Sequence, residues 1–487
     1  MARDPRDPGY ADFGLFVDGG WRPAAGGATY PVTDPATEET IGEAPAAGPA
    51  DVAAAIASAR RGLAAWRAVP TWERAARIRA IARLLTERKD TIAAAMTREV
   101  GKPLAQSAGE IQLAIDQFEW YAGETQRIHG QIVESRLPGG QIRVTHEPIG
   151  IVAAFTAWNF PAVLLARKIA PALAAGCSII CRPSEEAPGV AMHLIQACAD
   201  AGLPPGTVNL LTGKASAITP GLMAEPDVRK ISLTGSTAVG RQLIRDGAET
   251  LKRFSMELGG HAPVIVWDDV DAEQVAELCA QTKFKNAGQV CVSPSRYYLH
   301  EAVAEPFTRR FVEVARSLKL GNGFDADTEM GPLATRRRLE ETEALVEDTR
   351  AEGARLLAGG GRPAGFNRGF FFEPTVFDQV ADDGRLMTEE RFGPVVPIAT
   401  FADFDDVIGR ANSLELGLSA YLFTRDLKRA DDTAEALESG MVGVNTFGLA
   451  QAEAPFGGIK QSGFGREGGS LGIHDYLNVK YTHVVRG

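Results

Sequence analysis

The chain has 487 residues, of which 45% are hydrophobic and 23% are charged, as in ordinary globular proteins. A chain of this length is too long for one compact core, so we expect two to three domains. The formal net charge of −11 argues against a nucleic-acid-binding surface. The five cysteines form neither a zinc-binding spacing nor an even disulfide framework, so we expect no metal site and a reducing, cytoplasmic setting.

No segment has the pattern of a targeting or membrane-spanning sequence. Met1–Pro8 lacks the apolar core of a signal peptide. The apolar stretch 149–166 approaches the length of a membrane span, but Asn159 and Pro161 interrupt it. We interpret it as a strand, a loop and a buried helix, and expect no membrane contact.

The elements expected in chain order begin with helical periodicity at 52–66 and 74–100. Between residues 127 and 146, Gly139-Gly140 separates two strand-like stretches, as in a hairpin. Short strands then alternate with helices: strands at 149–155, 178–182, 208–210 and 228–233, and helices at 162–175, 187–201 and 237–249. A second alternating series runs from 263–266 to about residue 441. This alternation indicates open parallel sheets.

Cys291 and Glu257 have the chemistry of a thioester-forming site. Cys291 ends the small-residue loop Gly288–Cys291, and Glu257 precedes two glycines in another segment. A thiolate attacks a carbonyl carbon, and a carboxylate can then act as the base that brings water to the thioester. Each residue also has a plainer interpretation, as an inert buried cysteine and as a turn residue.

Two strand-to-helix junctions add to this pair. Asn159 stands before a helix that starts at Pro161, so its amide could donate to an oxyanion, although an N-cap is the plainer interpretation. The segment Leu233–Gly240 runs from a strand through a glycine turn into a helix, and helix N-termini bind phosphates. It lacks the G-x-G-x-x-G fingerprint of standard dinucleotide sites.

Seven ordered motifs resemble those of the aldehyde dehydrogenase superfamily over essentially the whole chain. The motifs are Trp158–Pro161, Arg182–Glu185, Leu233–Gly240, Met256–Gly260, Gly288–Cys291, Glu389–Val395 and Pro455–Gly458. The segment 454–468 is most similar to succinate-semialdehyde dehydrogenases. The resemblance implies an α/β fold with two open parallel-sheet domains, a Rossmann-type cofactor domain and a catalytic domain, plus a small β oligomerisation element.

The resemblance also implies boundaries and an assembly. The NAD-binding domain would comprise 1–126 and 149–259, the catalytic domain 260–459, and the oligomerisation element 127–148 and 470–487. In the last of these, the hairpin would join a C-terminal strand near Tyr481–Val485. A homodimer or homotetramer is expected.

The implied reaction is oxidation of an aldehyde to a carboxylic acid. Cys291 would add to the aldehyde to give a thiohemiacetal, whose oxyanion the Asn159 amide and the Cys291 backbone N–H would hold. Hydride transfer to the nicotinamide would leave a thioester. Glu257 would activate the water that hydrolyses it, and Glu467 would relay the proton.

The expected cofactor is NAD, with NADP use left open. Glu185 is typical of NAD-preferring members, because a carboxylate accepts hydrogen bonds from the ribose diol and repels a 2′-phosphate. Arg182 replaces the usual lysine, and a guanidinium binds phosphate well. The implied cofactor contacts are Thr156, Trp158, Arg182, Ser184, Glu185, Gly235, Ser236, Leu258, Glu390 and Phe392.

The expected substrate is a short anionic semialdehyde such as succinate semialdehyde. Arg167 matches an arginine of the succinate-semialdehyde enzymes, and a buried guanidinium requires an anion. A salt bridge to a protein carboxylate is the alternative. Phe160 and Phe456 would line the remaining walls, although buried phenylalanines are more often plain core.

Two departures weaken the narrow assignment. Lys285 replaces a second arginine of that subfamily, and its carboxylate-binding serine falls at or near Ala450 and Gln451. The expected pocket therefore also suits other substrates: glutarate semialdehyde, 2-oxoglutarate semialdehyde, a sulfonated or phosphonated aldehyde, or a broad range of aldehydes. A relative that transfers the acyl group to coenzyme A is disfavoured by Glu257, since hydrolysis needs that base. A non-catalytic protein is disfavoured by the joint presence of Cys291, Glu257 and Asn159.

Overall fold

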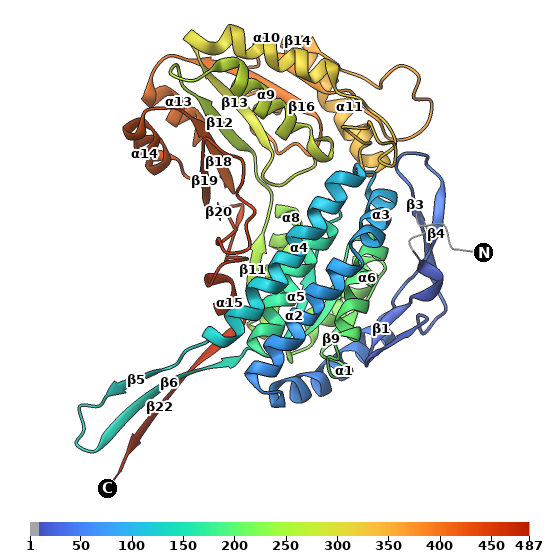
Figure 1. The fold of residues 1–487 in the computed structure, drawn as a ribbon, viewed down its shortest axis with the longest axis vertical. Helices are drawn as coiled ribbons and strands as arrows, with labels where there is room; N and C mark the ends of the chain where they lie inside the picture. The colour runs from blue at the N-terminus through green and yellow to red at the C-terminus, as the bar shows by residue number, and fades with distance from the viewer. Residues whose placement is uncertain (1–8, 487) are drawn as a thin grey trace.

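The structure is a computed structural model that describes residues 9–486. The expectation for Met1–Pro8 lies outside these residues. Figure 1 shows two lobes, one formed mainly by the first half of the chain and one by the second, and a long arm that projects from the first lobe and ends near the C-terminus. Among the described residues, no helix is long and apolar enough to cross a bilayer.

The first lobe is built on an eight-stranded sheet whose central strands are parallel. Its strands, in spatial order, are β2 (Gly20–Arg22), β1 (Leu15–Val17), β9 (Val208–Leu210), β8 (Ser178–Arg182), β7 (Ile151–Phe155), β10 (Val228–Thr234), β11 (Arg253–Glu257) and β21 (Gly463–Phe464). Every residue of β7 is buried, as expected for a strand covered on both faces. Val152 and Ala154 face one apolar cluster, and Ile151, Ala153 and Phe155 face the other.

Helices cover both faces of this sheet (Figure 1). They are α1 (Pro49–Ala68), α2 (Thr71–Glu87), α3 (Lys89–Val100), α4 (Leu104–Glu124), α5 (Pro161–Ala175), α6 (Pro188–Asp200), α7 (Ala215–Ala224) and α8 (Thr237–Gly247). All residues of α5 are buried, since it lies against the sheet and contacts α2, α4 and α6. The predicted helices and strands of this lobe are confirmed, but the periodic segment 74–100 is two helices divided at Arg88.

The second lobe contains a seven-stranded sheet that is parallel except at one edge. Its strands, in spatial order, are β14 (Arg355–Ala358), β15 (Thr375–Asp378), β16 (Val395–Phe401), β13 (Pro294–His300), β12 (Ala262–Val266), β18 (Ser419–Phe423) and β19 (Met441–Val444). Its helices are α9 (Ala272–Lys283), α10 (Glu301–Ser317), α11 (Arg336–Ala351), α12 (Arg385–Thr388), α13 (Phe404–Ala411) and α14 (Leu427–Ala436). A separate apolar cluster forms its core.

The arm in Figure 1 is a three-stranded antiparallel sheet. The hairpin β5 (Gln131–Glu134) and β6 (Gly140–Pro148) pairs with β22 (Leu477–Val485), so the predicted pairing of the hairpin with the C-terminal strand is confirmed. The smaller elements are β3 (Thr29–Thr33), β4 (Thr40–Pro45), β17 (Leu416–Gly417), β20 (Ile459–Lys460) and α15 (Leu471–His474). The three domain boundaries stay predictions.

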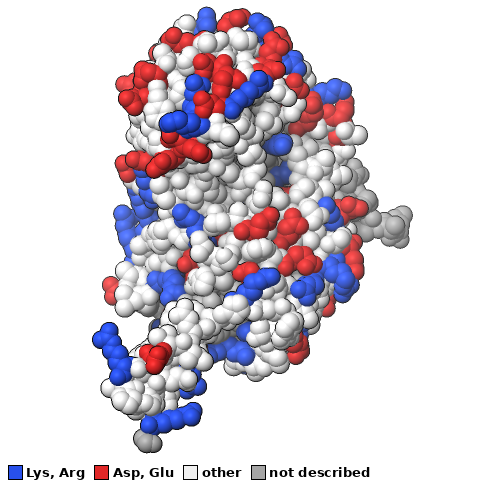
Figure 2. Space-filling view, turned by 60° about the vertical axis from the view of Figure 1, so that its left-hand side comes forward, with Lys and Arg blue, Asp and Glu red and all other residues white. Residues whose placement is uncertain are grey.

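The surface carries charges of both signs. On the face drawn in Figure 2, acidic and basic side chains are interspersed over the upper lobe, and a hollow lies between the upper and lower parts. Such a distribution gives the face no continuous basic stripe of the kind that binds nucleic acids.

Candidate active site

A cavity of about 340 Å³ lies where the two lobes meet. The first lobe contributes the carboxyl ends of β7, β10 and β11, the usual place for ligands in parallel α/β sheets. The second lobe contributes the loop before β13, the start of α11 and the loop after α12. The predicted site residues that line it are Trp158, Asn159, Gly235, Ser236, Glu257, Leu258, Cys291, Glu390 and Phe392.

Glu257, the last residue of β11, is buried beside Cys291. Within the part of the chain that the structure describes, neither of its carboxylate oxygens has a conventional hydrogen-bond partner. Burial raises the pKa of Glu257 to about 7, and the nearby Glu467 carboxylate acts in the same direction. Lys168, Arg167 and the Cys291 thiol act in the opposite direction. A carboxyl group that titrates near neutrality is suited to general-base chemistry.

Cys291 is half-buried, whereas the other four cysteines are fully buried. Burial raises the pKa of the Cys291 thiol well above its usual range, and the negative charge of Glu257 adds to this effect while Arg167 opposes it. The sulfur is therefore a thiol at neutral pH. A thiol next to a carboxylate has a base at hand that can accept its proton as the sulfur attacks a carbonyl carbon.

The loop that presents Cys291 has an unusual backbone. In the 3₁₀ turn Lys285–Gly288, Asn286 and Ala287 have φ values of 50° and 52°, a region that non-glycine residues seldom adopt. The Asn286 side chain donates to the backbone oxygens of Asn159 (3.1 Å) and Gln289 (3.2 Å), which ties this loop to the first lobe. Lys285 is exposed and is not among the residues that line the cavity.

Asn159 is held from two sides. Its side-chain nitrogen donates to the Gln289 oxygen at 3.2 Å, and its own backbone oxygen accepts from Lys102 Nζ at 3.0 Å. Lys102 forms a fully buried ion pair with Glu110, whose other oxygen accepts from the Ala162 N–H at 2.8 Å in the first turn of α5. Sequence reasoning missed Lys102 and Glu110, because a buried charge pair leaves no periodic signal.

Glu467 reaches the site from the C-terminal part of the chain. It pairs with Lys168, which is completely buried on α5 and also donates to Thr234 Oγ1 at 2.9 Å. The second carboxylate oxygen of Glu467 has no partner. Lys168 was not predicted, although it directly follows Arg167 in the sequence.

Arg167 is 3% exposed and has no ion pair among residues 9–486. Its guanidinium carbon lies 4.0 Å from the centroid of the Phe456 ring, and its Nε and Nη2 have no hydrogen-bond partner. The alternative of a salt bridge to a protein carboxylate is therefore not seen. Arg167 lowers the pKa of both Cys291 and Glu257, which places a buried, unpaired cation next to the two candidate catalytic side chains.

The other expected wall residues differ in their surroundings. Phe456 is buried in a small apolar cluster that also contacts Cys291 and Ala450. Phe160 is half-buried, packs against the core of the first lobe, and lies under Lys102 Nζ, 4.0 Å from the ring centroid. Gln451 is exposed.

Glu390 and Phe392 extend from the second lobe. Glu390 Oε1 accepts from the Gly260 N–H at 3.0 Å, and a Cβ atom at Gly259 would collide with the Glu390 carboxylate. Burial raises the pKa of Glu390 to about 7. The Phe392 ring lies edge-on to Trp158, with centroids 6.0 Å apart.

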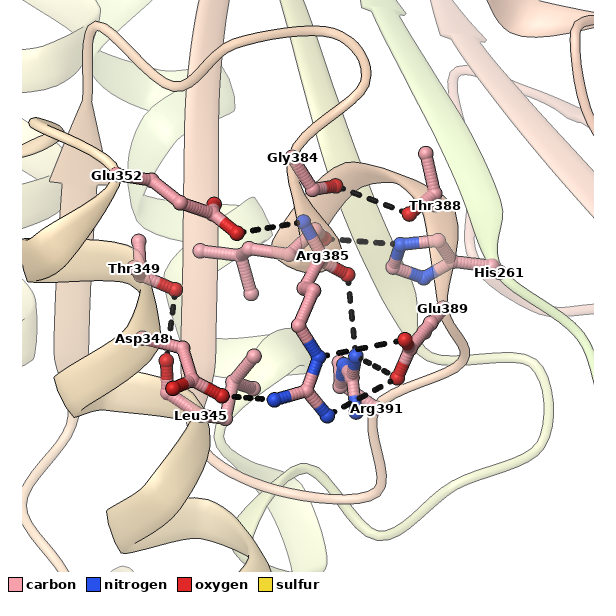
Figure 3. Close-up of polar contacts among 11 residues, drawn as sticks. His261, Leu345, Asp348, Thr349, Glu352, Gly384, Arg385, Thr388, Glu389 and Arg391 are labelled. Carbon is pink, nitrogen blue, oxygen red and sulfur yellow. Dashed lines mark hydrogen bonds and ion pairs between the residues drawn. The ribbon is translucent and has the colours of Figure 1, made fainter.

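Ion pairs fix the loop that carries Glu390 (Figure 3). Arg385 pairs with Asp348 of α11 and with Glu389, and Arg391 also pairs with Glu389. Arg391 donates as well to the Arg385 backbone oxygen at 3.1 Å. The His261 ring contacts the Leu386 backbone oxygen at 3.1 Å, which ties the same turn to the segment after β11.

The remaining predicted cofactor residues lie around the glycine turns of the first lobe. Ser236 is the N-cap of α8 and accepts from the Val239 N–H at 3.4 Å. Arg182 Nη2 donates to Glu185 Oε1 at 2.8 Å and to the Gly213 oxygen at 2.9 Å. Thr156, Arg182 and Ser184 do not line the 340 Å³ cavity, and Glu185 lines a neighbouring cavity of about 540 Å³.

These features fit a nicotinamide dinucleotide. A helix N-terminus beside the cavity suits phosphate, and the Glu390 carboxylate suits a ribose diol. Among the described residues, no group of three or more His, Cys, Asp or Glu side chains is placed to hold a metal ion.

The model of the aldehyde dehydrogenase family matches residues 21–482. The chain belongs to this family. It is 42% identical to the glutarate-semialdehyde dehydrogenase of Pseudomonas putida KT2440 over 469 residues, covering 96% of this chain and 97% of the relative. It is also 42% identical to the 3-sulfolactaldehyde dehydrogenase of Pseudomonas putida, over 98% of each chain. The names of these two equally similar relatives refer to different anionic aldehydes.

Solved structures give the same result for the fold. The succinate-semialdehyde dehydrogenase of Burkholderia pseudomallei superposes with a TM-score of 0.95 at 42% identity, covering 97% of this chain and 98% of that one. The betaine aldehyde dehydrogenase of Staphylococcus aureus in complex with NAD⁺ has a TM-score of 0.94 at 33% identity, covering 96% and 94%. The predicted α/β aldehyde dehydrogenase fold and an NAD(P)-dependent oxidoreductase that acts on aldehydes are thereby confirmed. The roles of individual residues stay predictions.

Proposed function

We propose that this protein oxidises a short aldehyde with an anionic group at its far end to the corresponding dicarboxylic or sulfonated acid. Succinate semialdehyde is the substrate we expect first. The observation that carries this proposal is the buried guanidinium of Arg167, with two unpaired nitrogens next to Cys291 and Glu257. A buried cation without a counter-ion is costly, and a bound substrate anion offsets that cost.

In the proposed reaction, Cys291 is the nucleophile. Glu257 takes the proton of the thiol as the sulfur adds to the aldehyde carbon, and the product is a thiohemiacetal on Cys291. The oxyanion is stabilised by the Cys291 N–H and by the Asn159 amide, which must leave its bond to the Gln289 oxygen to donate there. The bound dinucleotide supplies the hydride acceptor for the oxidation.

Hydrolysis of the resulting thioester needs a base and a route for the proton. Glu257 first releases the proton that it took from the thiol. As a carboxylate again, it takes a proton from the water that attacks the thioester carbon, and the Cys291 sulfur leaves. Glu467, whose negative charge raises the pKa of Glu257, and its partner Lys168 pass the proton on. These groups make water, and not coenzyme A, the expected acceptor of the acyl group.

The dinucleotide contacts follow the geometry of the cavity. Ser236 and Gly235 would hold phosphate at the start of α8, Glu390 would bind the nicotinamide ribose, and Phe392 with Trp158 and Leu258 would border the ring. Thr156, Ser184, Glu185 and Arg182 would surround the adenosine ribose. We expect NAD to be preferred because Glu185 is a carboxylate and Arg182 is engaged by it.

The glutarate-semialdehyde and 3-sulfolactaldehyde dehydrogenases named above act, as their names state, on aldehydes with a carboxylate or a sulfonate end, which supports an anionic substrate without choosing one. In this chain Ala450 stands near Cys291 and Phe456, where a small apolar residue leaves the anion to Arg167. Glutarate semialdehyde and a sulfonated three-carbon aldehyde are therefore the main alternatives.

Initial rates with a panel of aldehydes test the proposal. The panel contains succinate semialdehyde, glutarate semialdehyde, 2-oxoglutarate semialdehyde, a sulfonated three-carbon aldehyde and benzaldehyde, each with NAD, with NADP, and with or without coenzyme A. We expect the highest kcat/KM for one anionic aldehyde, with no stimulation by coenzyme A. Equal values for charged and neutral aldehydes would refute the anion-binding role of Arg167.

We also propose a cytoplasmic homodimer or homotetramer assembled through the arm. The arm exposes apolar side chains, namely Ile132, Val133, Val479, Tyr481 and Val485. Exposed apolar groups on a projecting sheet are typical of contacts between subunits. Light scattering of the full chain would give the mass, and a monomer would contradict this proposal.

A further inference from the structure

The charge of the cavity is unusual for a site that must hold a pyrophosphate. Three carboxylates line it, from Glu186, Glu257 and Glu390. Its basic residues, among those that the structure describes, are Arg337 and Arg338, and both come from the second lobe. Arg182, the basic residue expected near the adenosine ribose, does not line this cavity and is engaged by Glu185 and the Gly213 oxygen.

Arg337 and Arg338 lie at the start of α11, after the N-cap Thr335. The Arg338 side chain is 27% exposed, and it lies near Glu390, since both line the cavity and its positive charge lowers the pKa of that carboxyl. The Arg337 side chain is 79% exposed. Both form ion pairs with Glu341, one turn further along the helix.

The preceding arginine, Arg336, points elsewhere. It pairs with Glu38 and its guanidinium carbon lies 5.4 Å from the centroid of the Phe370 ring. It lines the neighbouring cavity of about 540 Å³ and not the one at Cys291. Three consecutive arginines are thus divided between two cavities, and Arg336 provides a matched control on the same helical turn.

The first lobe contributes Gly235 and Ser236, at the start of α8, to the same cavity. Backbone N–H groups at a helix N-terminus bind phosphate, but they carry no full charge. A guanidinium supplies a full charge and two parallel donors. The two lobes therefore present complementary halves of an anion site across one cavity.

We infer that Arg338, assisted by Arg337, binds the pyrophosphate of the dinucleotide from the second lobe, opposite the start of α8. This inference rests on the proposed function, because it requires that a dinucleotide occupies the cavity. Glu341 is the ion-pair partner of both guanidinium groups until the pyrophosphate takes its place. The bound pyrophosphate bridges the two lobes, so binding stiffens the cleft between them.

Measurements of equilibrium binding test this site independently of catalysis. Isothermal titration of the full-length protein measures the affinities for NAD, ADP-ribose and adenosine, at salt concentrations from about 50 to about 300 mM. The variants are Arg338→Gln, Arg337→Gln, Arg336→Gln and Glu341→Gln. ADP-ribose carries the pyrophosphate without nicotinamide, and adenosine carries neither phosphate.

We expect Arg338→Gln to weaken the binding of NAD and of ADP-ribose about tenfold and to make both affinities less dependent on salt. The affinity for adenosine should be unchanged. Arg337→Gln should have a smaller effect in the same direction, and Arg336→Gln none. Glu341→Gln should bind ADP-ribose at least as tightly as the native protein, because both arginines are then free of their carboxylate partner.

Two results would overturn the inference alone, with NAD binding by the native protein intact. One is an unchanged ADP-ribose affinity in the Arg338→Gln variant. The other is an equal loss in Glu341→Gln and Arg338→Gln, which would make the ion pair with Glu341 the whole role of Arg338. A native protein that binds neither NAD nor NADP would overturn both the inference and the proposed function. Circular dichroism of each variant confirms that it is folded.

Discussion

The guanidinium of Arg167 lies over the ring of Phe456, 4.0 Å from its centroid, while two of its nitrogens have no partner. A ring face attracts a cation but cannot accept its in-plane N–H donors. The ring therefore orients Arg167 and leaves its donors directed at whatever anion enters. A buried guanidinium with unpartnered donors is suited to bind a carboxylate or a sulfonate.

Replacing Arg167 tests whether it binds the anionic end of the substrate. Arg167→Met should lower kcat/KM for the preferred anionic aldehyde by roughly 100-fold, a loss of about 3 kcal/mol, because the substrate anion is left buried without a partner. Benzaldehyde should be little affected. Arg167→Lys keeps the charge and loses the paired donors, so its kcat/KM for the anionic aldehyde should lie between those of the native protein and Arg167→Met. Steady-state kinetics provide the values, and equal losses for both aldehydes would point to a structural role instead.

The pKa of Glu257 predicts a pH dependence of thioester hydrolysis. Burial raises this pKa to about 7, and the base is the unprotonated form. The hydrolysis rate should therefore rise with pH and level off above about 7, and should fall about tenfold per pH unit well below it. Single-turnover hydrolysis of an acyl-enzyme made with a p-nitrophenyl ester isolates this step.

Glu257→Gln is the matched variant for that experiment. Its acyl-enzyme should still form from the activated ester but should hydrolyse at least about 100-fold more slowly, without the inflection. An inflection that persists in Glu257→Gln would assign the titration to another group, with Glu467 the next to test.

The raised pKa of Cys291 predicts slow alkylation in the absence of cofactor. Because the sulfur is a thiol at neutral pH, iodoacetamide should react more slowly than with a free cysteine, and the rate should keep rising above pH 8 or so. The other cysteines are buried, so one thiol per folded chain should react. Mass spectrometry locates the label, and Cys291→Ala should abolish both labelling and dehydrogenase turnover.

The bond between Arg182 and Glu185 predicts how cofactor preference can be changed. In the native chain the carboxylate both repels a 2′-phosphate and occupies the guanidinium. Glu185→Gln removes the repulsion and frees Arg182, so the ratio of kcat/KM for NADP over NAD should rise at least about tenfold. The double variant Arg182→Ala/Glu185→Gln should lose most of that gain. A ratio unchanged by Glu185→Gln would place the 2′-hydroxyl elsewhere.

The buried pair Lys102–Glu110 predicts a stability effect. Glu110→Gln keeps an oxygen for the Ala162 N–H but leaves the Lys102 ammonium buried and unpaired, at a cost of about 3 to 5 kcal/mol. The melting temperature should fall, and the Asn159 backbone oxygen loses a fixed donor. Lys102→Met should cost less, because two backbone N–H groups still stabilise the Glu110 carboxylate. Equal melting temperatures for Glu110→Gln and the native chain would contradict the assigned role.

The alternating part of the fold could be predicted because its pattern is local. The strands β7 and β8 and helices α5 and α6 are largely apolar, and β10 and α8 adjoin the turn at Gly235; the structure reproduces them together with β9. Helix α4 was not predicted, because its buried face includes Ser107, Glu110, Gln117 and Glu124, which interrupt the apolar repeat. The three-residue strands β1 and β2 were missed as well, since they form a very short hairpin that joins the sheet only through the pairing of Phe16 with the distant Leu210.

The candidate site also combines residues that the sequence predicts with residues that it does not. Cys291, Glu257 and Asn159 stand in short motifs, and the structure brings all three to one cavity. Ala287 gives no sign of its positive φ, since alanine seldom adopts that conformation. Lys168, Lys102 and Arg338 are ordinary charged residues in the sequence, and only their burial or their place in the cavity distinguishes them. Interactions that depend on distant partners have no local signature.

The C-terminal residues complete structures that begin much earlier in the chain. Strand β21 supplies the edge partner of β11, Glu467 pairs with Lys168, and β22 pairs with β6 along its whole length. During translation, these places stay unfilled until residues 463–485 have been synthesised. A ribosome that stops before residue 463 therefore releases a chain in which the edge of β11 is open and Lys168 lacks its carboxylate partner.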